Sequence, residues 1–191
     1  MINMEKGTGG FINPEKVIGQ LDVKRGMTVA DFGCGHGYFT IPVARLVGSE
    51  GRVFAIDVLA EALEAVRSRA QIEQITNIET IRGNLETYCG SGLPERSVDM
   101  VLLHNVLFQS NKKIEIIKEA KRVLRISGIF MVADWLPVSS LSAVEKAVIG
   151  PPDNQRLLVD EARKLVGDQD FKFLRDFDAG EYHYGLIFIK P

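Results

Sequence analysis

Three glycines beside one acidic residue form the part of this sequence best suited to binding a ligand. Asp31 ends a short apolar stretch and is followed by Gly33, Gly35 and Gly37 at alternate positions. Glycine has no Cβ, so such a turn can adopt positive φ angles and lets a ligand lie directly against the backbone. The carboxylate of Asp31 would attract an ammonium group and repel a pyrophosphate. The turn therefore favours a ligand with an amino-acid end.

The glycine spacing separates two classes of nucleotide-like ligand. A dinucleotide fold uses the spacing G-x-G-x-x-G, so that a pyrophosphate can rest on a helix N-terminus. Counted from Gly33 and Gly35, the third glycine would fall at position 38, which is Tyr38. The mismatch disfavours an NAD(P)-dependent oxidoreductase, which we keep as the less favoured alternative.

Composition excludes several classes of protein. The 191 residues suit one domain, and a net charge of −2 provides no basic field that would attract nucleic acid. No apolar run approaches the ~18 residues of a membrane span, and the first residues lack the apolar region of a signal peptide. We therefore expect a cytoplasmic protein with neither a nucleic-acid partner nor a membrane span. The two cysteines, Cys34 and Cys89, are expected to be buried or semi-buried thiols, and no metal site is expected.

Apolar periodicity predicts alternating strands and helices along most of the chain. Strands are expected at 28–32, 52–56, 78–82, 97–103 and 129–133, and helices at 13–21, 38–47, 59–70 and 112–124. Continuously apolar strands joined by helices indicate a parallel sheet that is covered on both faces.

The C-terminal third follows a different pattern. A helix at 159–166 precedes two strand-like runs, 171–177 and 182–190, and Asp178-Ala179-Gly180 forms a short turn between them. This pair should be an antiparallel hairpin. The chain is therefore expected to form an α/β fold with a mostly parallel sheet of seven strands, an antiparallel C-terminal hairpin and helices on both faces.

The domain organisation follows from the same patterns. Residues 1–10 lack apolar periodicity and are expected to form a flexible arm, and residues 11–191 a single domain. The stretch 136–158 is irregular and contains a Gly150-Pro151-Pro152 helix breaker, so we expect it to cover the edge of the sheet where a substrate would enter. Arg156 in this stretch is expected to bind a carboxylate or phosphate, or to be a solvated surface residue.

Polar residues end three of the expected strands, on the side where open α/β sheets bind ligands. Asp57 can accept hydrogen bonds from both hydroxyls of a ribose, or cap the following helix. His104 and the adjacent Asn105 can face a reacting group, with His104 either a general base or a hydrogen-bonded polar residue. Asp134 can remove a proton, hold a cationic substrate or cap the following turn. Asp99 lies at the opposite end of its strand, so we expect it to be structural.

The pattern D-x-G-x-G-x-G at 31–37 resembles the first motif of the class I S-adenosylmethionine-dependent methyltransferases. Asp57, Asn84, the strand that begins near Asp99 and the terminal hairpin extend the resemblance over 11–191. Within that superfamily the chain is similar to the branch that contains the ubiquinone and menaquinone biosynthesis methyltransferases. The family usually has an aspartate in place of Asn84, whose side-chain carbonyl can accept the same hydrogen bond. The resemblance implies a Rossmann-like sheet.

The resemblance also implies S-adenosyl-L-methionine as the cofactor and assigns a part of it to each residue. Asp31 and the backbone of the glycine turn would hold the methionine end, Asp57 the ribose and Asn84 the adenine. The implied cofactor-binding residues are Asp31, Gly33, Cys34, Gly35, Gly37, Asp57, Val58, Asn84, Leu85 and His104.

The implied reaction is methyl transfer to a small-molecule acceptor. Because this is an in-line displacement, the protein mainly holds the nucleophile, the methyl group and the sulfur aligned in a shielded pocket. His104, Asn105 and Asp134 are the residues expected around the acceptor, in a monomer or a homodimer. A protein that binds the cofactor for regulation or as a scaffold, without turnover, is the other alternative.

Overall fold

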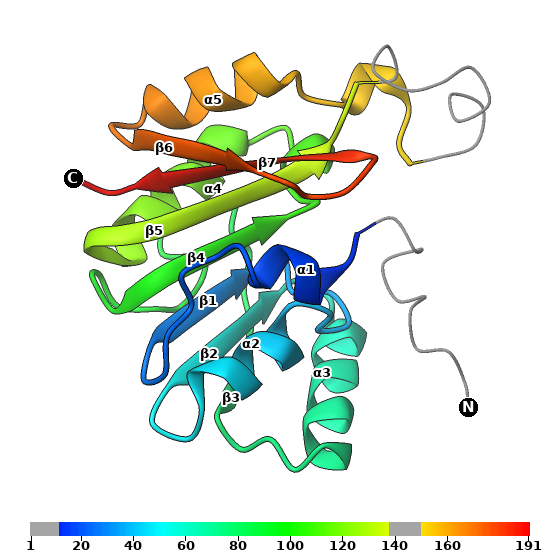
Figure 1. Ribbon diagram of the computed structural model, residues 1–191, viewed down its shortest axis with the longest axis vertical. Coiled ribbons are helices and arrows are strands. Elements are labelled where there is room, and N and C mark those ends of the chain that lie inside the picture. The colour runs from blue at the N-terminus through cyan, green and yellow to red at the C-terminus, as the bar shows by residue number, and fades with distance from the viewer. Residues whose placement is uncertain (1–11, 138–149) are drawn as a thin grey trace.

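A seven-stranded sheet runs through the middle of the protein (Figure 1). The computed structural model describes residues 12–137 and 150–191. The strands are β1 (Thr28–Phe32), β2 (Arg52–Asp57), β3 (Ile78–Arg82), β4 (Val98–His104), β5 (Leu124–Trp135), β6 (Lys172–Phe177) and β7 (His183–Ile189). The α-helices are α1 (Pro14–Ile18), α2 (Thr40–Val47), α3 (Ala60–Ile72), α4 (Lys113–Val123) and α5 (Val159–Gly167), with short 3₁₀ helices η1 (Leu107–Gln109) and η4 (Asp153–Gln155).

The order of the strands confirms the predicted fold. Across the sheet the order is β3-β2-β1-β4-β5-β7-β6, in which β1 to β5 pair in parallel. Strand β7 lies between β5 and β6 and is antiparallel to both. The C-terminal hairpin is therefore present, and its last strand is inserted into the sheet rather than added at the edge.

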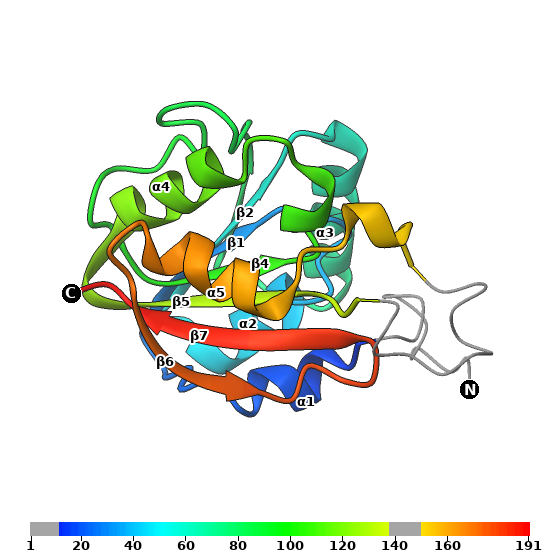
Figure 2. The ribbon, with the colours of Figure 1, turned by 90° about the horizontal axis from the view of Figure 1, so that it is seen from above.

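Helices cover both faces of the sheet, as the apolar strands predict. Buried residues of α1 and α2 pack with Val29 and Leu102 on one face. Buried residues of α4 and α5 pack with Phe32 and Leu103 on the other. Figure 2 shows α1 and α2 on one side of the strands and α4 on the opposite side. Side chains of a strand alternate between the two faces, so neighbouring residues on β1 and β4 belong to different cores.

Two elements differ in length from the expectation. Helix α1 starts as predicted, with the Asn13 side chain accepting from the backbone of Lys16 and Pro14 in the first turn, but Gly19 caps it early. Strand β5 is longer than predicted because it begins directly after α4 at Leu124, which pairs with Val98 before an irregular step in the register. Helix α1 still begins where predicted, and the strand predicted at 129–133 lies within β5.

Two single-residue predictions are tested by the fold. Asp99 has the predicted structural role, because it accepts from the backbone N–H of Thr28 at 2.8 Å and forms an ion pair with Arg125. Cys34 is buried as predicted, whereas Cys89 is exposed and has a positive φ of 55°. The prediction for Cys89 was wrong because the residue lies on a surface turn, where its side chain does not pack into a hydrophobic core.

Parts of the chain fall outside this description. The arm expected at 1–10 and the central part of the expected cover, residues 138–149, lie outside the described residues. No helix among the described residues is both long and apolar enough to cross a membrane.

A buried ion pair ties the loop after β3 to helix α4. Glu119 accepts from the backbone N–H of Ser91 at 3.0 Å and from the guanidinium of Arg122 at 2.7 Å, and both charged side chains are largely buried. Arg122 also donates to the backbone carbonyl of Leu93 at 2.7 Å. The network holds the loop that leads from one edge of the site to β4.

Glu119→Ala should lower the free energy of unfolding by about 3–5 kcal/mol, because it leaves the buried Arg122 without its carboxylate. The matched control is Glu115→Ala on the same helix, whose ion pair with Lys118 is exposed and should contribute less than about 1 kcal/mol. Urea unfolding followed by circular dichroism measures both. Equal losses in the two variants would contradict the role assigned to Glu119.

Candidate functional site

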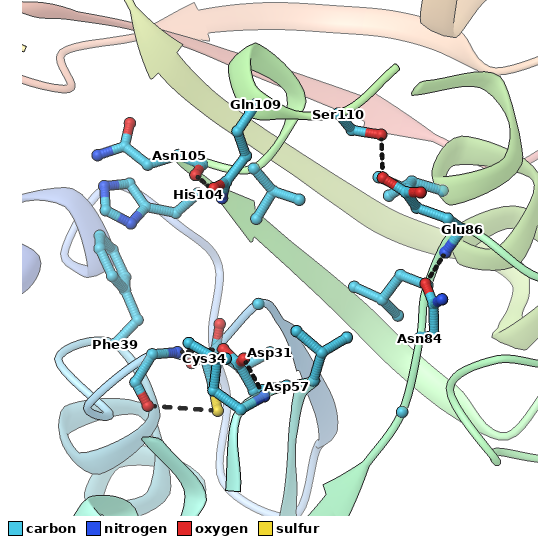
Figure 3. A pocket seen from close by; sticks show the side chains of 18 of the residues that line it. Asp31, Cys34, Phe39, Asp57, Asn84, Glu86, His104, Asn105, Gln109 and Ser110 are labelled. Atoms are coloured by element: carbon cyan, nitrogen blue, oxygen red, sulfur yellow. Dashed lines mark hydrogen bonds between the residues drawn. The ribbon is translucent and has the colours of Figure 1, made fainter. Parts of the chain in front are cut away.

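A cavity of about 720 Å³ opens at the carboxyl ends of β1, β2 and β4 (Figure 3). The residues that line it come from the turn after β1, the end of β2, the loop after β3 and the segment from His104 to η1. They are Asp31, Gly33, Cys34, Gly35, His36, Tyr38, Phe39, Asp57, Val58, Leu59, Gly83, Asn84, Leu85, Glu86, His104, Asn105, Val106, Gln109, Ser110 and Ile116. The cavity thus collects most of the predicted site residues.

All three predicted glycines of the turn have a positive φ, which favours glycine, but not all of them face the cavity. Gly33 and Gly35 line the cavity with φ of 74° and 49°. A Cβ on Gly33 would lie 2.5 Å from Val106, whereas a Cβ on Gly35 would meet open space. Gly37, with φ of 80°, does not line the cavity; its Cβ would press on Val66 of α3. Gly33 and Gly37 therefore permit close packing against Val106 and Val66, whereas the space beside Gly35 is open.

Asp31 places a buried carboxylate at one side of the cavity. Its Oδ2 accepts a hydrogen bond of 2.5 Å from the Thr40 hydroxyl. Burial raises the pKa of Asp31 to about 6, because the carboxylate has lost water without gaining a cation. Among the described residues that line the cavity, none is Lys or Arg. An ammonium group of a ligand would supply the missing positive charge.

Asp57 holds both the start of α3 and the glycine turn. Its Oδ1 accepts from the backbone N–H of Leu59 at 3.0 Å, at the residue that caps α3. Its Oδ2 accepts from the backbone N–H of Gly35 at 2.9 Å and so holds the glycine turn against β2. Each carboxylate oxygen has a second acceptor site. The side chain lines the cavity and can still accept hydrogen bonds from two hydroxyl groups.

The loop after β3 forms the far end of the cavity. Asn84 is exposed, and its Oδ1 accepts from the backbone N–H of Glu86 at 3.0 Å in a local turn. Leu85 is buried and lines the cavity, and Val58 is half-exposed at its rim. These apolar side chains offer surfaces on which a flat ring can lie.

Sequence reasoning missed several lining residues at this end. The Ser110 hydroxyl donates to Glu86 at 2.7 Å, and the Gln109 side chain donates to the backbone carbonyl of Asn105 at 3.1 Å. Their elements, a turn and a 3₁₀ helix, carry no periodic signal, and no motif marks them. Only the fold brings the loop after β3 against the segment after β4.

His104 and Asn105 lie together at the opposite end, as predicted. The ring of His104 packs against Phe39 with centroids 4.6 Å apart. Within the described part of the chain, His104 Nε2 and Asn105 Oδ1 are buried without a hydrogen-bond partner. Burial, and then the nearby His183, lower the pKa of His104 to about 3. The ring is therefore neutral near pH 7.

Asp134 does not join this group, which corrects the expectation that it lies around the acceptor. Its Oδ2 accepts from the backbone N–H of Phe108 at 3.0 Å and its Oδ1 from that of Trp135 at 2.8 Å. The residue is buried and does not line the cavity. Its carboxylate caps the η1 turn, the third of the roles its sequence position allowed.

Arg156 is buried and does not line the cavity, so the prediction of a solvated surface residue is wrong. Its guanidinium donates to the backbone carbonyls of Leu136 at 2.8 Å and Pro151 at 2.9 Å. It lies 5.6 Å from the ring centre of Trp135. The side chain thus fastens together two segments that are distant in sequence.

Comparison with known proteins agrees with this arrangement. The sequence matches the family model described as a methyltransferase domain over residues 23–164. The chain belongs to this methyltransferase family. The class I resemblance inferred from the glycine turn is thereby confirmed, and so is the identification of the domain as that of an enzyme.

Several methyltransferases are similar in sequence. The chain is 37% identical to the aklanonic acid methyltransferase DauC of Streptomyces sp. (strain C5) over 84 residues, which cover 44% of this chain and 37% of that protein. It is 27% identical to the demethylmenaquinone methyltransferase of Geobacillus stearothermophilus over 113 residues, covering 59% and 47% respectively. The chain therefore spans less than half of the length of these curated relatives.

A solved methyltransferase has the same fold. The crystal structure of a SAM-dependent methyltransferase from Aquifex aeolicus superimposes with a TM-score of 0.82 over 95% of this chain and 91% of that one, at 24% identity. That protein is described as using S-adenosylmethionine. The cavity fits it, because the carboxylates of Asp31, Asp57 and Glu86 make the lining acidic and the cofactor carries an ammonium and a sulfonium.

The three histidines of the chain provide a direct check of the site's electrostatics. His104 and His183, with pKa values lowered to about 3 and about 4 by burial, should stay neutral from pH 8 down to pH 5. Nuclear magnetic resonance of the imidazole C–H protons should show two histidines with constant chemical shifts over this range. His104→Asn identifies one of the two signals. A His104 signal that titrates near pH 6.5 would contradict the burial described above.

Proposed function

We propose that this protein transfers a methyl group from S-adenosylmethionine to a small-molecule acceptor. The observation that supports it best is the order of groups along the cavity. Asp31 stands beside the glycine turn, Asp57 follows at the next strand, and Asn84 with Leu85 lies at the far end. This order matches the order of the ammonium, ribose and adenine along the cofactor.

Each of these residues has a task under the proposal. Asp31 would neutralise the ammonium, and the backbone of Gly33 and Gly35 allows the methionine end to approach closely. Asp57 would accept from the ribose hydroxyls through its remaining acceptor sites, and Asn84 from the adenine amino group. When bound, the cofactor would supply an electrophilic methyl group to a nucleophilic atom of the acceptor. The chain's main contribution is alignment.

The acceptor side favours a small molecule. His104, Asn105 and Phe39 enclose the end of the cavity beyond the glycine turn, and the cavity is of the size that ordinarily holds small ligands. The relatives' names point the same way, since one acts on aklanonic acid and another on demethylmenaquinone. The cytoplasmic location and the monomeric or homodimeric state stay predictions.

Turnover tests the proposal. The protein is incubated with methyl-labelled S-adenosylmethionine and a pool of small metabolites, and transfer of the label is followed together with formation of S-adenosylhomocysteine. We expect both to appear only in the presence of the metabolite fraction. Tight binding of the cofactor with no turnover on any fraction would favour the alternative of a regulatory or scaffold protein.

Asp57→Ala should weaken S-adenosylmethionine binding at least tenfold, because hydrogen bonds to a charged group contribute about 1.5–3 kcal/mol and tenfold corresponds to ~1.4 kcal/mol. Isothermal titration calorimetry measures the affinity. Glu61→Ala, in the exposed first turn of α3 and outside the cavity, is the matched control and should bind like the wild type. Undiminished binding by Asp57→Ala would refute the ribose assignment.

Cofactor affinity should fall as the pH falls through about 6. The ammonium favours the ionised form of Asp31, whose pKa is raised to about 6 in the free protein by burial, so protons compete with the cofactor below that pH. The dissociation constant should rise by up to about tenfold for each pH unit below 6. Asp31→Asn should bind weakly and without this slope.

Asp134 provides the control for the pH measurement, because burial also raises its pKa to about 6 but it lies outside the cavity. Asp134→Asn should keep the wild-type slope. The same slope in Asp31→Asn, or its loss in Asp134→Asn alone, would show that another group controls the affinity.

A further inference from the structure

A row of four rings leads away from the cavity along one face of the sheet. Phe39 packs on His104 with centroids 4.6 Å apart, His104 lies 5.9 Å from His183, and His183 lies 4.2 Å from Trp135. The three strands concerned, β4, β5 and β7, are neighbours in the sheet. The row therefore joins the edge of the cavity to the C-terminal hairpin.

The two imidazoles in this row lack hydrogen-bond partners. Within the described part of the chain, His104 Nε2 and both ring nitrogens of His183 are buried and unpaired. His183 is only 3% exposed. Buried polar atoms without partners are uncommon and costly, at about 1–3 kcal/mol each. The two imidazoles lie 5.9 Å apart between ring centroids, so each is a candidate partner for the other.

The electrostatic surroundings keep both rings neutral. Burial, and then the guanidinium of Arg156, lower the pKa of His183 to about 4. Arg156 lies behind Trp135, 5.6 Å from that ring centre. No carboxylate among the described residues is hydrogen-bonded to either imidazole, since Asp134 accepts from backbone N–H groups instead. A neutral imidazole carries one N–H donor and one acceptor nitrogen.

A neutral His104 is poorly suited to remove a proton. General bases work best when their pKa is near the operating pH, and a ring whose conjugate acid is this strong holds a proton weakly. The same property suits a hydrogen-bond donor, because a neutral imidazole N–H can stabilise a negative oxygen without losing its proton. Which nitrogen carries that proton depends on the hydrogen bond made by the other nitrogen.

We propose that His183 is a positioning residue for methyl transfer: its ring N–H donates to Nε2 of His104, which fixes the His104 proton on Nδ1 and makes that N–H a donor to an anionic oxygen of the acceptor. The ring centroids are 5.9 Å apart and the ring planes are tilted by 36° to each other, so this donation requires a change in ring orientation. The acceptor is then a molecule that binds as a phenolate or enolate, having lost its proton to solvent beforehand. Its negative charge is complementary to the sulfonium. This inference rests on the proposed function and names the class of acceptor for it.

The first test reads the tautomer directly. In protein with ¹⁵N-labelled histidine and bound S-adenosylhomocysteine, the nitrogen chemical shifts of His104, identified with His104→Asn, should report a proton on Nδ1. His183→Phe keeps a ring of similar shape but has no donor, and should shift His104 towards the Nε2-protonated form or a mixture. His183→Gln retains an N–H donor and should preserve the wild-type tautomer. A purely structural role of His183 would leave the tautomer unchanged in all three proteins.

The second test reads the class of acceptor. 4-Nitrophenol and 4-nitro-1-naphthol are titrated into the S-adenosylhomocysteine complex, and the visible absorbance of their ionised forms is followed. The wild type should bind at least one of them as the anion and lower its apparent pKa. His183→Phe should weaken this binding at least tenfold, and His183→Gln should restore most of it.

Tyr184→Phe is the matched control. Tyr184 is adjacent on β7 but packs in the opposite core, and its buried hydroxyl is also unpaired within the described residues. It should behave like the wild type in both tests. Calorimetry of S-adenosylhomocysteine should be unchanged in His183→Phe, His183→Gln and Tyr184→Phe, which shows that the fold and the cofactor site are intact.

The outcomes are distinguishable. An Nε2-protonated His104 in the wild type, an unchanged tautomer in His183→Phe, or binding of neither phenol by the wild type would each overturn the inference while leaving methyl transfer possible. Failure of the wild type to bind S-adenosylhomocysteine would instead overturn the proposed function.

Discussion

The parallel pairing of β1 with both of its neighbours is the constraint on which the site depends. Phe32 is the last residue of β1 and pairs with Ile56 on one side and Leu103 on the other. The next residues along the three strands, Gly33, Asp57 and His104, therefore stand in one row at the same edge of the sheet. A shift of one residue in either pairing would turn Asp57 or His104 to the opposite face. The two cores that hold this register are thus as important to the site as its own side chains.

The two ends of the cavity differ in their electrostatic character. Carboxylates occupy the cofactor part of the cavity, where Asp31 is costly to ionise until a cation arrives. His104 and Phe39 line the other part, and the row of rings continues outside the cavity through His183 to Trp135, which lies near the guanidinium of Arg156. The resulting field favours a cation at the glycine turn and negative charge near His104. A cationic methyl donor and an electron-rich acceptor would each find the complementary end.

Much of the fold could be predicted because its signals are local. The strands β1 and β3 lie at the predicted residues, since apolar runs between turn residues have few other interpretations. The inserted position of β7 between β5 and β6 has no local signal, because it depends on pairing with β5. The extra length of β5 was missed because it depends on pairing with Val98, a contact that no local pattern reveals.

Some of the residues predicted for the candidate site line the cavity and others do not, and the exceptions share a cause. Asp134 and Trp135 are adjacent at the end of β5, so only one of them can point to the face that carries His104. The aspartate points to the other face and caps a turn, and the tryptophan packs on His183. Arg156 was misjudged because the two carbonyls that it holds, Leu136 and Pro151, are brought together only by the fold.

By itself, the sequence determined the alternation of strands and helices, the glycine turn and the acid beside it, and hence the kind of cofactor. These features depend on residues close together in the chain, whose backbone preferences and spacing act locally. The tertiary structure alone decided that Gly37 serves packing, that Glu86 and Ser110 join the cavity, and that His104 lies beside His183. Those outcomes depend on which face of a strand meets which neighbour, and pairings such as that of Trp135 with His183, far apart in the sequence, decide that.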